Sequence, residues 1–351
     1  MSRPVVLILG GSGFIGRALQ KRLGNQYDLI IADLQRNHST DTSSMQCHIF
    51  DQGEAKQVEE LLSKLASCSD RLAGAIHLTA YYDFRNQPDA RYTNLEATFP
   101  QLLKGLDELL PVGAPILHSS SMAAMAPTNP GVPLSAESTR VGTWVYPKHK
   151  LNMEHIIESA QLDRPVAELV LAGVYSEQCE LVPLFQQIER LRKRRPEALF
   201  FPGNADRGLT YVHVDDVAEA FAKALVKLKD RPRIHRLLIG ETSAFTYREI
   251  HNAASQCFHG YNLPLIWVPR WFAMVGASVL GWLGDRVGVR RFLRGWMVRY
   301  AGEHFEFDIG PTEHSIAWQP KNQLSDRLPT ILQFAKSQPG DWLTVNRARP
   351  W

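Results

Sequence analysis

Three spaced glycines that follow an apolar run constrain most strongly what this chain can fold into. The run is "PVVLILGGSGFIG", residues 4–16, and its Gly10, Gly13 and Gly16 precede a helical pattern. Glycine permits a tight turn and the close approach of a diphosphate, and the N-terminus of the next helix offers unpaired N–H groups to that anion. The stretch predicts the first βα turn of a dinucleotide-binding fold; the simpler alternative is a plain tight turn.

Short apolar or β-branched runs alternate with helical patterns through the first half of the chain. This alternation is typical of βαβ units and a parallel sheet. After Tyr175 the alternation loosens, and toward the C-terminus the pattern is mostly helical. We therefore expect an α/β fold, a Rossmann doubly wound parallel sheet with a smaller, mostly helical C-terminal substrate lobe. The expected core is residues 1–175 with 209–240 returning to it, and the expected lobe is 176–208 and 241–351.

The totals argue against several classes of protein. The 39 basic and 36 acidic residues of this 351-residue chain nearly cancel, so we expect no nucleic-acid partner. The four cysteines are scattered without the spacing of a metal site, so we expect no metal and reduced thiols in a cytoplasmic protein. The longest apolar stretch after the first, residues 271–284, is shorter than the roughly 20 residues that cross a membrane.

Two carboxylates stand where expected strands end. Asp33 lies twenty residues after Gly13, where it can accept hydrogen bonds from the adenosine ribose and repel a 2′-phosphate, which favours NAD over NADP. The nearby Arg36 weakens that preference. Asp51 follows the third expected strand and could bind the adenine amino group. Either residue could instead only form a turn.

A tyrosine and a lysine are spaced four residues apart in "VYPKHK". Tyr146 and Lys150 would share one helix face, and no other tyrosine here has a lysine at that offset. Such a pair is usually only solvated surface. Ser121, in "HSSSMAAM" at the end of the fifth expected strand, precedes Tyr146 by 25 residues. Ser119 and Ser120 are adjacent and could share its role.

Together these motifs, in this order, resemble the extended short-chain dehydrogenase/reductase superfamily, which includes nucleotide-sugar epimerases and dehydratases and the 3β-hydroxysteroid dehydrogenase group. The similarity covers most of residues 4–240, including "NLEAT", "AGVY" and "YVHVDDVAEA", and extends to the C-terminal "AWQPKNQLSDRL". It implies that Tyr146 takes the proton from a substrate hydroxyl. It also implies that Ser121 hydrogen-bonds the developing carbonyl and that Lys150 holds the nicotinamide ribose. A lysine ammonium would also lower the pKa of the tyrosine.

The expected cofactor is NAD, with NADP less favoured. The residues expected to bind it are Gly10, Gly13, Phe14, Ile15, Gly16, Asp33, Asp51, Leu78, Thr79, Ala80, Tyr146, Lys150 and Val174.

The chain departs from the superfamily pattern at the position of a phosphate-binding arginine. Nucleotide-sugar enzymes usually carry Arg two positions before the aromatic residue of "YVHVDD"; here Leu209 stands there, and Arg207 is two residues away. In addition, Pro147 follows Tyr146, which the start of a helix can tolerate.

The segment 263–300 combines tryptophan and phenylalanine with arginine. Its members are Trp267, Trp271, Phe272, Trp282, Phe292 and Trp296 with Arg286, Arg290, Arg291, Arg294 and Arg299. Three interpretations stay open: a helical pair packed on the lobe, a lid over an apolar substrate, and a helix in a membrane interface.

We expect an NAD-dependent oxidoreductase that interconverts a secondary alcohol and a ketone on a largely apolar small molecule, sterol-like or lipid-like. The alternative is a nucleotide-sugar epimerase or dehydratase that recycles its NAD. A third hypothesis is a non-catalytic NAD-binding subunit. The membrane-interface interpretation of residues 263–300 would place the protein in peripheral contact with the inner face of a membrane, and the resemblance implies a homodimer.

Overall fold

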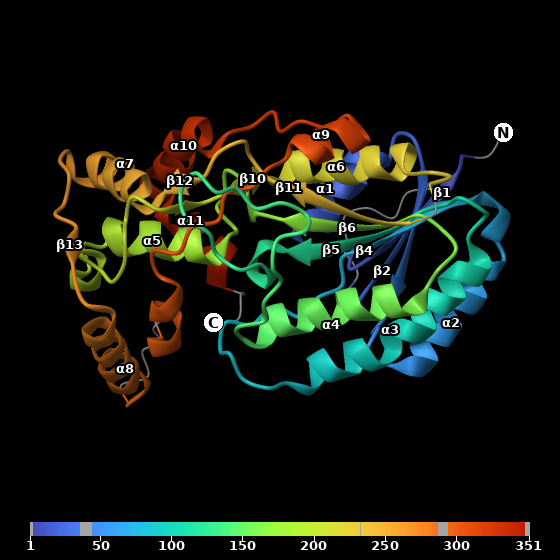
Figure 1. Cartoon of the computed structure of the whole chain (residues 1–351), viewed down its shortest axis with the longest axis horizontal. Helices are drawn as coiled ribbons and strands as arrows, with labels where there is room; N and C mark the ends of the chain where they lie inside the picture. Colours follow the sequence, from blue (N-terminus) through green and yellow to red (C-terminus); the bar gives the residue numbers. More distant parts are fainter. Residues whose placement is uncertain (1–2, 36–43, 232, 287–293, 348–351) are drawn as a thin grey trace.

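A seven-stranded parallel sheet forms the centre of the protein (Figure 1). The computed structural model describes residues 3–35, 44–231, 233–286 and 294–347. The strand order is β11-β6-β5-β4-β1-β2-β3. The strands are β1 (Val5–Leu9), β2 (Asp28–Asp33), β3 (Met45–Ile49), β4 (Leu72–His77), β5 (Ile116–Ser121), β6 (Val166–Leu171) and β11 (Ile234–Ile239). The chain moves outward from β1 in one direction and then from β4 in the other, which creates a switch point at the carboxyl ends of the strands.

Helices cover both faces of this sheet, as a parallel sheet requires. On one face lie α1 (Phe14–Leu23) and α6 (Val214–Lys227), and on the other lie α2 (Ala55–Ala66), α3 (Ala90–Leu109) and α4 (Val145–Ala160). The alternation of β1 divides its side chains between the two cores: Val6 and Ile8 join the first, while Val5, Leu7 and Leu9 join the second. The predicted Rossmann-type α/β fold is confirmed.

A smaller lobe follows, with a core of its own. Its helices are α5 (Val182–Arg192), α7 (Tyr247–His259), α10 (Leu324–Ser337) and α11 (Pro339–Arg347), and they bury Phe185 and Trp342. Three short strand pairs contribute: β7 (Gly173–Tyr175) with β10 (Tyr211–His213), β9 (Gly208–Leu209) with β12 (Phe245–Thr246), and β8 (Phe200–Phe201) with β13 (Ile266–Trp267). The exact domain limits stay a prediction.

The chain returns to the sheet between these lobe elements. Helix α6 packs on α1, and β11 forms the edge of the sheet beside β6. Near the C-terminus, α9 (Gly310–Ile316) also packs on α6. The helix α8 (Arg270–Arg286) and the 3₁₀ helix η4 (Gly295–Tyr300) pack on each other, and α8 lies far from the large sheet (Figure 1). None of the helices in the described ranges is both long and apolar enough to cross a membrane.

Candidate active site

Ser121, Tyr146 and Lys150 come together where β5 ends beside α4. Ser121 is the last residue of β5, and its side chain hydrogen-bonds that of Tyr146. Tyr146 and Lys150 lie one turn apart on α4, with the Lys150 Nζ 5.9 Å from the centroid of the tyrosine ring. Lys150 is buried, and its Nζ donates to the carbonyl of Ser119 at 2.8 Å. The fold therefore brings the three predicted catalytic residues into one place.

Burial sets the protonation states of this group. It raises the pKa of Tyr146 to about 12, and the hydrogen bond with Ser121 opposes the shift. Burial also lowers the pKa of Lys150 to about 8, against the attraction of the Glu154 carboxylate. At neutral pH the tyrosine is thus a neutral phenol and the lysine an ammonium. The expectation that Lys150 lowers the pKa of Tyr146 finds no support in this geometry, because the opposing effect comes from Ser121.

The two serines before Ser121 have other partners. The buried Ser120 hydroxyl donates to Glu154, and Arg140 Nη2 donates to the same hydroxyl at 3.2 Å. Ser119 contributes its carbonyl to Lys150. Ser121 is therefore the serine that the structure brings to Tyr146, whereas Ser120 belongs to a buried ion-pair network with Glu154 and Arg140.

The glycine-rich turn leaves space for a ligand at the start of α1. Gly10 has φ of +75°, and a Cβ there would lie 2.8 Å from the backbone nitrogen of Thr79. A Cβ at Gly16 would lie 2.1 Å from the carbonyl oxygen of Gly11, so only glycine permits this packing of helix against turn. No side chain caps α1, whose N-cap residue is Gly13. Such an uncapped helix start suits the diphosphate of a dinucleotide.

The carboxylates predicted to bind the cofactor also stabilise turns. Asp33 ends β2, and its Oδ2 accepts a hydrogen bond of 2.8 Å from the backbone N–H of Ser12 in the glycine-rich turn. Asp51 stands two residues after β3 and accepts from the N–H of Gly53 at 2.8 Å. Each lies in the expected place. Arg36 lies outside the described residues.

The segment after β4 fits the same dinucleotide. The backbone N–H of Leu78 donates to the carbonyl of Leu9, which keeps residues 78–80 beside the glycine-rich turn. The hydroxyl of Thr79 is buried without a hydrogen-bond partner among the described residues, as expected of a group that meets a bound ligand. Ala80 is exposed, and Val174 lies in β7. The residues present thus fit NAD at the switch point of the sheet.

Sequence reasoning missed a layer of buried histidines near Lys150. His77 and His118 are paired across β4 and β5, with Nδ1 atoms 2.9 Å apart, and the Nε2 of His77 lies 2.9 Å from the Gln52 Oε1. Burial, and next the Lys150 charge, place the pKa of both histidines well below the usual range. His149 on α4 binds Glu96 at 2.8 Å. His77 is the last residue of β4 and His118 lies within β5, and only the strand register shows that they meet.

A cavity of about 490 Å³ reaches from Ser121 into the lobe. Apolar and aromatic side chains form most of its wall, with contributions from both the sheet end and the lobe. Among them are Tyr82, Phe84, Met122, Trp144, Leu184, Leu209, Tyr211, Trp296, Met297 and Tyr300. The ring of Tyr82 lies 4.6 Å from that of Tyr146 in an edge contact, and Trp144 lies 5.1 Å from Trp296. The first contact joins α4 to the segment after β4, and the second joins the start of α4 to η4; the sequence did not predict either of them.

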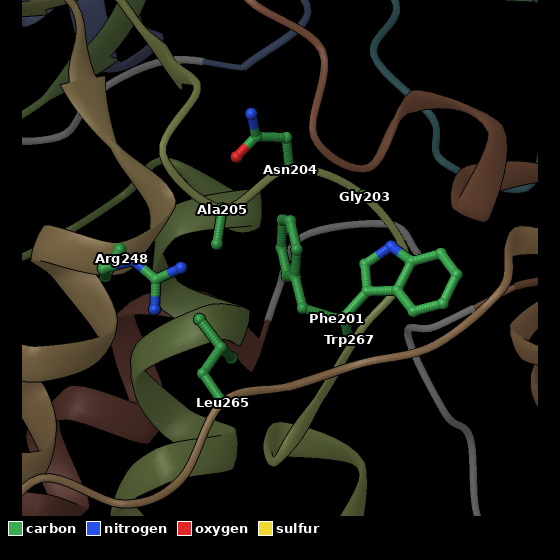
Figure 2. Close-up of a pocket in the computed structure, with 7 residues that line it drawn as sticks. All are labelled: Phe201, Gly203, Asn204, Ala205, Arg248, Leu265 and Trp267. Carbon is green, nitrogen blue, oxygen red and sulfur yellow. The ribbon is translucent and has the colours of Figure 1, made fainter.

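Figure 2 shows a smaller cavity of about 250 Å³ in the lobe. Phe201 and Trp267, which pair between β8 and β13, line it together with Leu265, and Arg248 reaches it from α7. The Arg248 guanidinium already binds the Asp206 carboxylate, so this hollow offers no unpaired charge of its own.

Three solved structures illustrate what the fold is similar to. For Thermotoga maritima UDP-glucose 4-epimerase with UDP-glucose, identity is 17%, the TM-score is 0.68, and the match covers 95% of this chain and 99% of that one. For Bacillus cereus UDP-glucuronic acid 4-epimerase with UDP-glucuronic acid and NAD, identity is 16%, the TM-score is 0.67, and the match covers 95% of this chain and 99% of that one. For the Bordetella bronchiseptica enzyme WbmG with NAD, identity is 15%, the TM-score is 0.69, and the match covers 99% of this chain and 97% of that one. At these identities the likeness shows the fold alone.

No curated protein sequence matches this chain. The model of the NAD dependent epimerase/dehydratase family does match it, over residues 6–240. This stretch contains the glycine-rich turn, Ser121 and the Tyr146–Lys150 pair. Because the match covers more than half of the chain, the protein belongs to the NAD dependent epimerase/dehydratase family, which confirms the predicted resemblance to extended short-chain dehydrogenases and reductases.

Proposed function

We propose that this protein interconverts a secondary alcohol and a ketone with NAD, the cofactor of its family. The observation that carries the proposal is the hydrogen-bonded pair of Ser121 and Tyr146, which lies beside the buried Lys150 and at the edge of the large cavity. When bound, NAD supplies the hydride acceptor and a positive charge. In the oxidation direction Tyr146 first loses its phenol proton to solvent, a loss that the positive charge of bound NAD would favour. The phenolate then takes the proton of the substrate hydroxyl, and Ser121 donates a hydrogen bond to the same oxygen as it becomes a carbonyl.

In the reverse direction the same groups act with opposite roles. The raised pKa of about 12 keeps Tyr146 protonated at neutral pH, so it is ready to donate a proton to a ketone oxygen. Lys150, fixed by the Ser119 carbonyl, would hold the nicotinamide ribose. The main role of the Lys150 ammonium is therefore to bind the cofactor, and its charge assists proton transfer by Tyr146 only when NAD is bound.

The wall of the cavity favours an apolar substrate, sterol-like or lipid-like. Leu209, which stands where nucleotide-sugar enzymes usually carry a phosphate-binding arginine, lines this cavity. A leucine there supplies apolar contact and no charge for a diphosphate. Aromatic side chains such as Phe84 and Trp144 contribute further apolar area next to Ser121.

A second candidate is a nucleotide-sugar epimerase or dehydratase that restores its NAD in each turnover. The family model favours it, and so do the similar structures solved with UDP-sugars; the comparisons support this candidate more than the lipid-like substrate. The third hypothesis, a non-catalytic NAD-binding subunit, is disfavoured because Ser121, Tyr146 and Lys150 are all present and adjacent.

Nicotinamide absorbance separates the candidates. Purified protein and NAD are incubated with a pool of lipid-like secondary alcohols and, separately, with a pool of nucleotide sugars, each also with the Tyr146→Phe variant. NADH that appears with the lipid pool and requires Tyr146 supports the first candidate. Conversion of a nucleotide sugar without net NADH, again requiring Tyr146, establishes the second and rejects the first. No Tyr146-dependent change in either pool would contradict the proposed chemistry.

The exposed face of α8 supports peripheral contact with an anionic membrane. Trp271, Val275, Val279 and Trp282 recur at helical spacing on one face, and Trp271 is 69% exposed. The guanidinium of Arg286 lies 3.9 Å above the ring of Trp282. Between residues 261 and 302 the sequence has six arginines and one acidic residue, Asp285, a balance that complements anionic lipid. A cytoplasmic enzyme bound in this way would lie at the inner face of a membrane.

Vesicle sedimentation tests this contact. We expect the protein to bind vesicles of phosphatidylglycerol and phosphatidylcholine, and Trp271→Ser with Trp282→Ser to remove that binding. The matched control is Val112→Ser, which changes another exposed apolar residue outside α8 and should leave binding intact. If the tryptophan variant instead dissociates a homodimer in sedimentation experiments and vesicles bind neither protein, a second copy covers this face and the membrane proposal is wrong.

A further inference from the structure

Arg190 is a cation in the wall of an otherwise mostly apolar cavity. It lies on α5 and lines the same cavity as Ser121. Among the described residues, none forms a hydrogen bond or an ion pair with its guanidinium. The neighbouring basic residues differ, since Arg192 binds Glu189 at 2.8 Å and Lys193 binds it at 3.0 Å. The carboxylate of α5 is thus used by other partners, and Arg190 points its charge at the cavity.

Arg190 is partly buried in this wall. Burial lowers the pKa of the guanidinium to about 10, while the Glu197 charge raises that pKa and the Arg195 charge lowers it further. Arg190 stays protonated at neutral pH. A charged group removed from water without a partner raises the free energy of the folded state, and such groups are kept where a ligand supplies the partner.

We propose that Arg190 binds an anionic group of the substrate, a phosphate or a carboxylate, at the lobe side of the cavity. The inference rests on the proposed function, because it assigns the second contact of the molecule whose alcohol meets Ser121 and Tyr146. A planar guanidinium binds such anions through two parallel hydrogen bonds, which gives orientation as well as affinity. The substrate is then amphiphilic, with an apolar body between its reacting carbinol and its anion.

This assignment also accounts for the position of Leu209. Leu209 and Arg190 line the same cavity, and so do Arg299 and the acidic residues Glu197 and Glu303. A leucine at 209 therefore does not leave the cavity without a cation, and Arg190 supplies one from α5. Two classes of substrate could carry the anionic group that Arg190 binds: a phosphorylated or carboxylated lipid, and a nucleotide diphosphate. The structure favours the first because the rest of the wall is chiefly apolar.

Calorimetric titration of the NAD-loaded protein tests the proposal without requiring turnover. The probes are decyl phosphate, decanol as its neutral analogue, and UDP. We expect Arg190→Met to weaken decyl phosphate binding about 10- to 100-fold and to leave decanol binding unchanged, because only the charge-assisted contact is lost. Arg190→Lys keeps the charge but loses the two parallel hydrogen bonds, so its affinity for decyl phosphate should lie between those of the unchanged protein and Arg190→Met.

A matched variant removes an arginine of the same segment that does not line the cavity. Arg194→Met takes away an exposed guanidinium that binds His259 at 3.0 Å, and it should bind every probe as the unchanged protein does. If UDP alone depends on Arg190, the anion site stands and its source is a nucleotide. If Arg190→Met and Arg194→Met bind both anions equally well, the proposal is wrong.

The test also separates this proposal from the proposed chemistry. Tyr146→Phe should keep the Arg190-dependent affinity for the anion, because the phenol takes part in proton transfer and not in anion binding. If Tyr146→Phe keeps turnover, the proposed chemistry fails; if Arg190→Met keeps the anion affinity of the unchanged protein, the anion site fails.

Discussion

Strand β1 and helix α8 are both rich in apolar residues, yet their surroundings are opposite. Every side chain of β1 is buried, with Val6 at 0% exposure, because helices of the same chain cover both faces of the sheet. On α8, Phe272 is 57% exposed and Val275 is 59% exposed. The apolar residues of β1 form part of the core, whereas those of α8 form an exposed surface that is available to a membrane or to another protein.

The polar and charged residues also differ between the two regions, since several near α4 are buried and those described on α8 are exposed. Lys150, His77 and His118 are buried in or near α4, while the arginines described on α8 and η4 lie at or near the surface. Burying a charge costs free energy, and the sheet half bears this cost where the proposed chemistry occurs. The sheet half should therefore be the region where single substitutions have large effects, and α8 the region where they have small ones.

The largest effect is expected at Tyr146. Tyr146→Phe removes the proton-transferring hydroxyl and should lower kcat about 10³-fold on whichever substrate the pools identify, while NAD affinity stays within about twofold. Turnover and NAD binding measured on one preparation check this. Turnover close to that of the unchanged protein would remove Tyr146 as the acid and base.

The next largest effect is expected at Gly16. Gly16→Ala puts a Cβ 2.1 Å from the Gly11 carbonyl oxygen, so helix α1 must shift away from the glycine-rich turn. We expect the free energy of unfolding to fall by about 1–3 kcal/mol. We also expect NAD binding to weaken, because the N-terminus of α1 moves with the turn. Urea unfolding and NAD titration are the measurements, and unchanged values in both would contradict the packing described.

A smaller change in the free energy of unfolding, opposite in sign to that of Gly16→Ala, is expected at Lys150. Its pKa falls from 10.5 to about 8 on folding, so the unfolded chain binds the proton more readily. The resulting penalty is complete below pH 8 and disappears as the pH rises through 10.5. Lys150→Met should therefore abolish turnover yet raise the free energy of unfolding at pH 7 by about 1–2 kcal/mol, after the lost hydrogen bond to Ser119 is subtracted.

The pH dependence is the control for this prediction. Urea unfolding at pH 7 and pH 10 should show the advantage of Lys150→Met shrinking at the higher pH, because wild-type stability gains there as the amine loses its proton. A constant difference at both pH values would mean that packing, and not the buried charge, sets the stability of this site.

The smallest effect is expected on α8. A Cβ at Gly276 would meet no atom within 4 Å, so Gly276→Ala removes only the backbone freedom of a helical glycine. Thermal unfolding should show a gain of about 0.5–1 kcal/mol. A loss as large as that at Gly16 would mean that α8 is packed as tightly as the sheet, and the contrast between the two regions would not hold.

Much of the sheet half could be predicted from local sequence. The glycine-rich turn, Asp33 at the end of β2 and the Tyr146–Lys150 spacing each depend on residues within a few turns or one strand, and each lies where it was expected. Arg190 and Trp144 could not be identified in this way. Their importance arises from a cavity whose walls come from segments distant in the chain, and no periodicity marks a residue for such a place.

The amino-acid sequence predicted the doubly wound sheet and the position of the dinucleotide turn, because these follow from local backbone preferences and from spacing along single elements. The roles proposed for Ser121, Tyr146 and Lys150 came from the resemblance to a family and not from spacing alone. Three features could be seen only in the folded protein: which of three adjacent serines contacts Tyr146, the contact of His77 with His118, and the hydrogen bond from Ser121 that opposes the rise in the Tyr146 pKa. Those outcomes depend on strand register and on burial, since both are set by contacts between residues far apart in the chain.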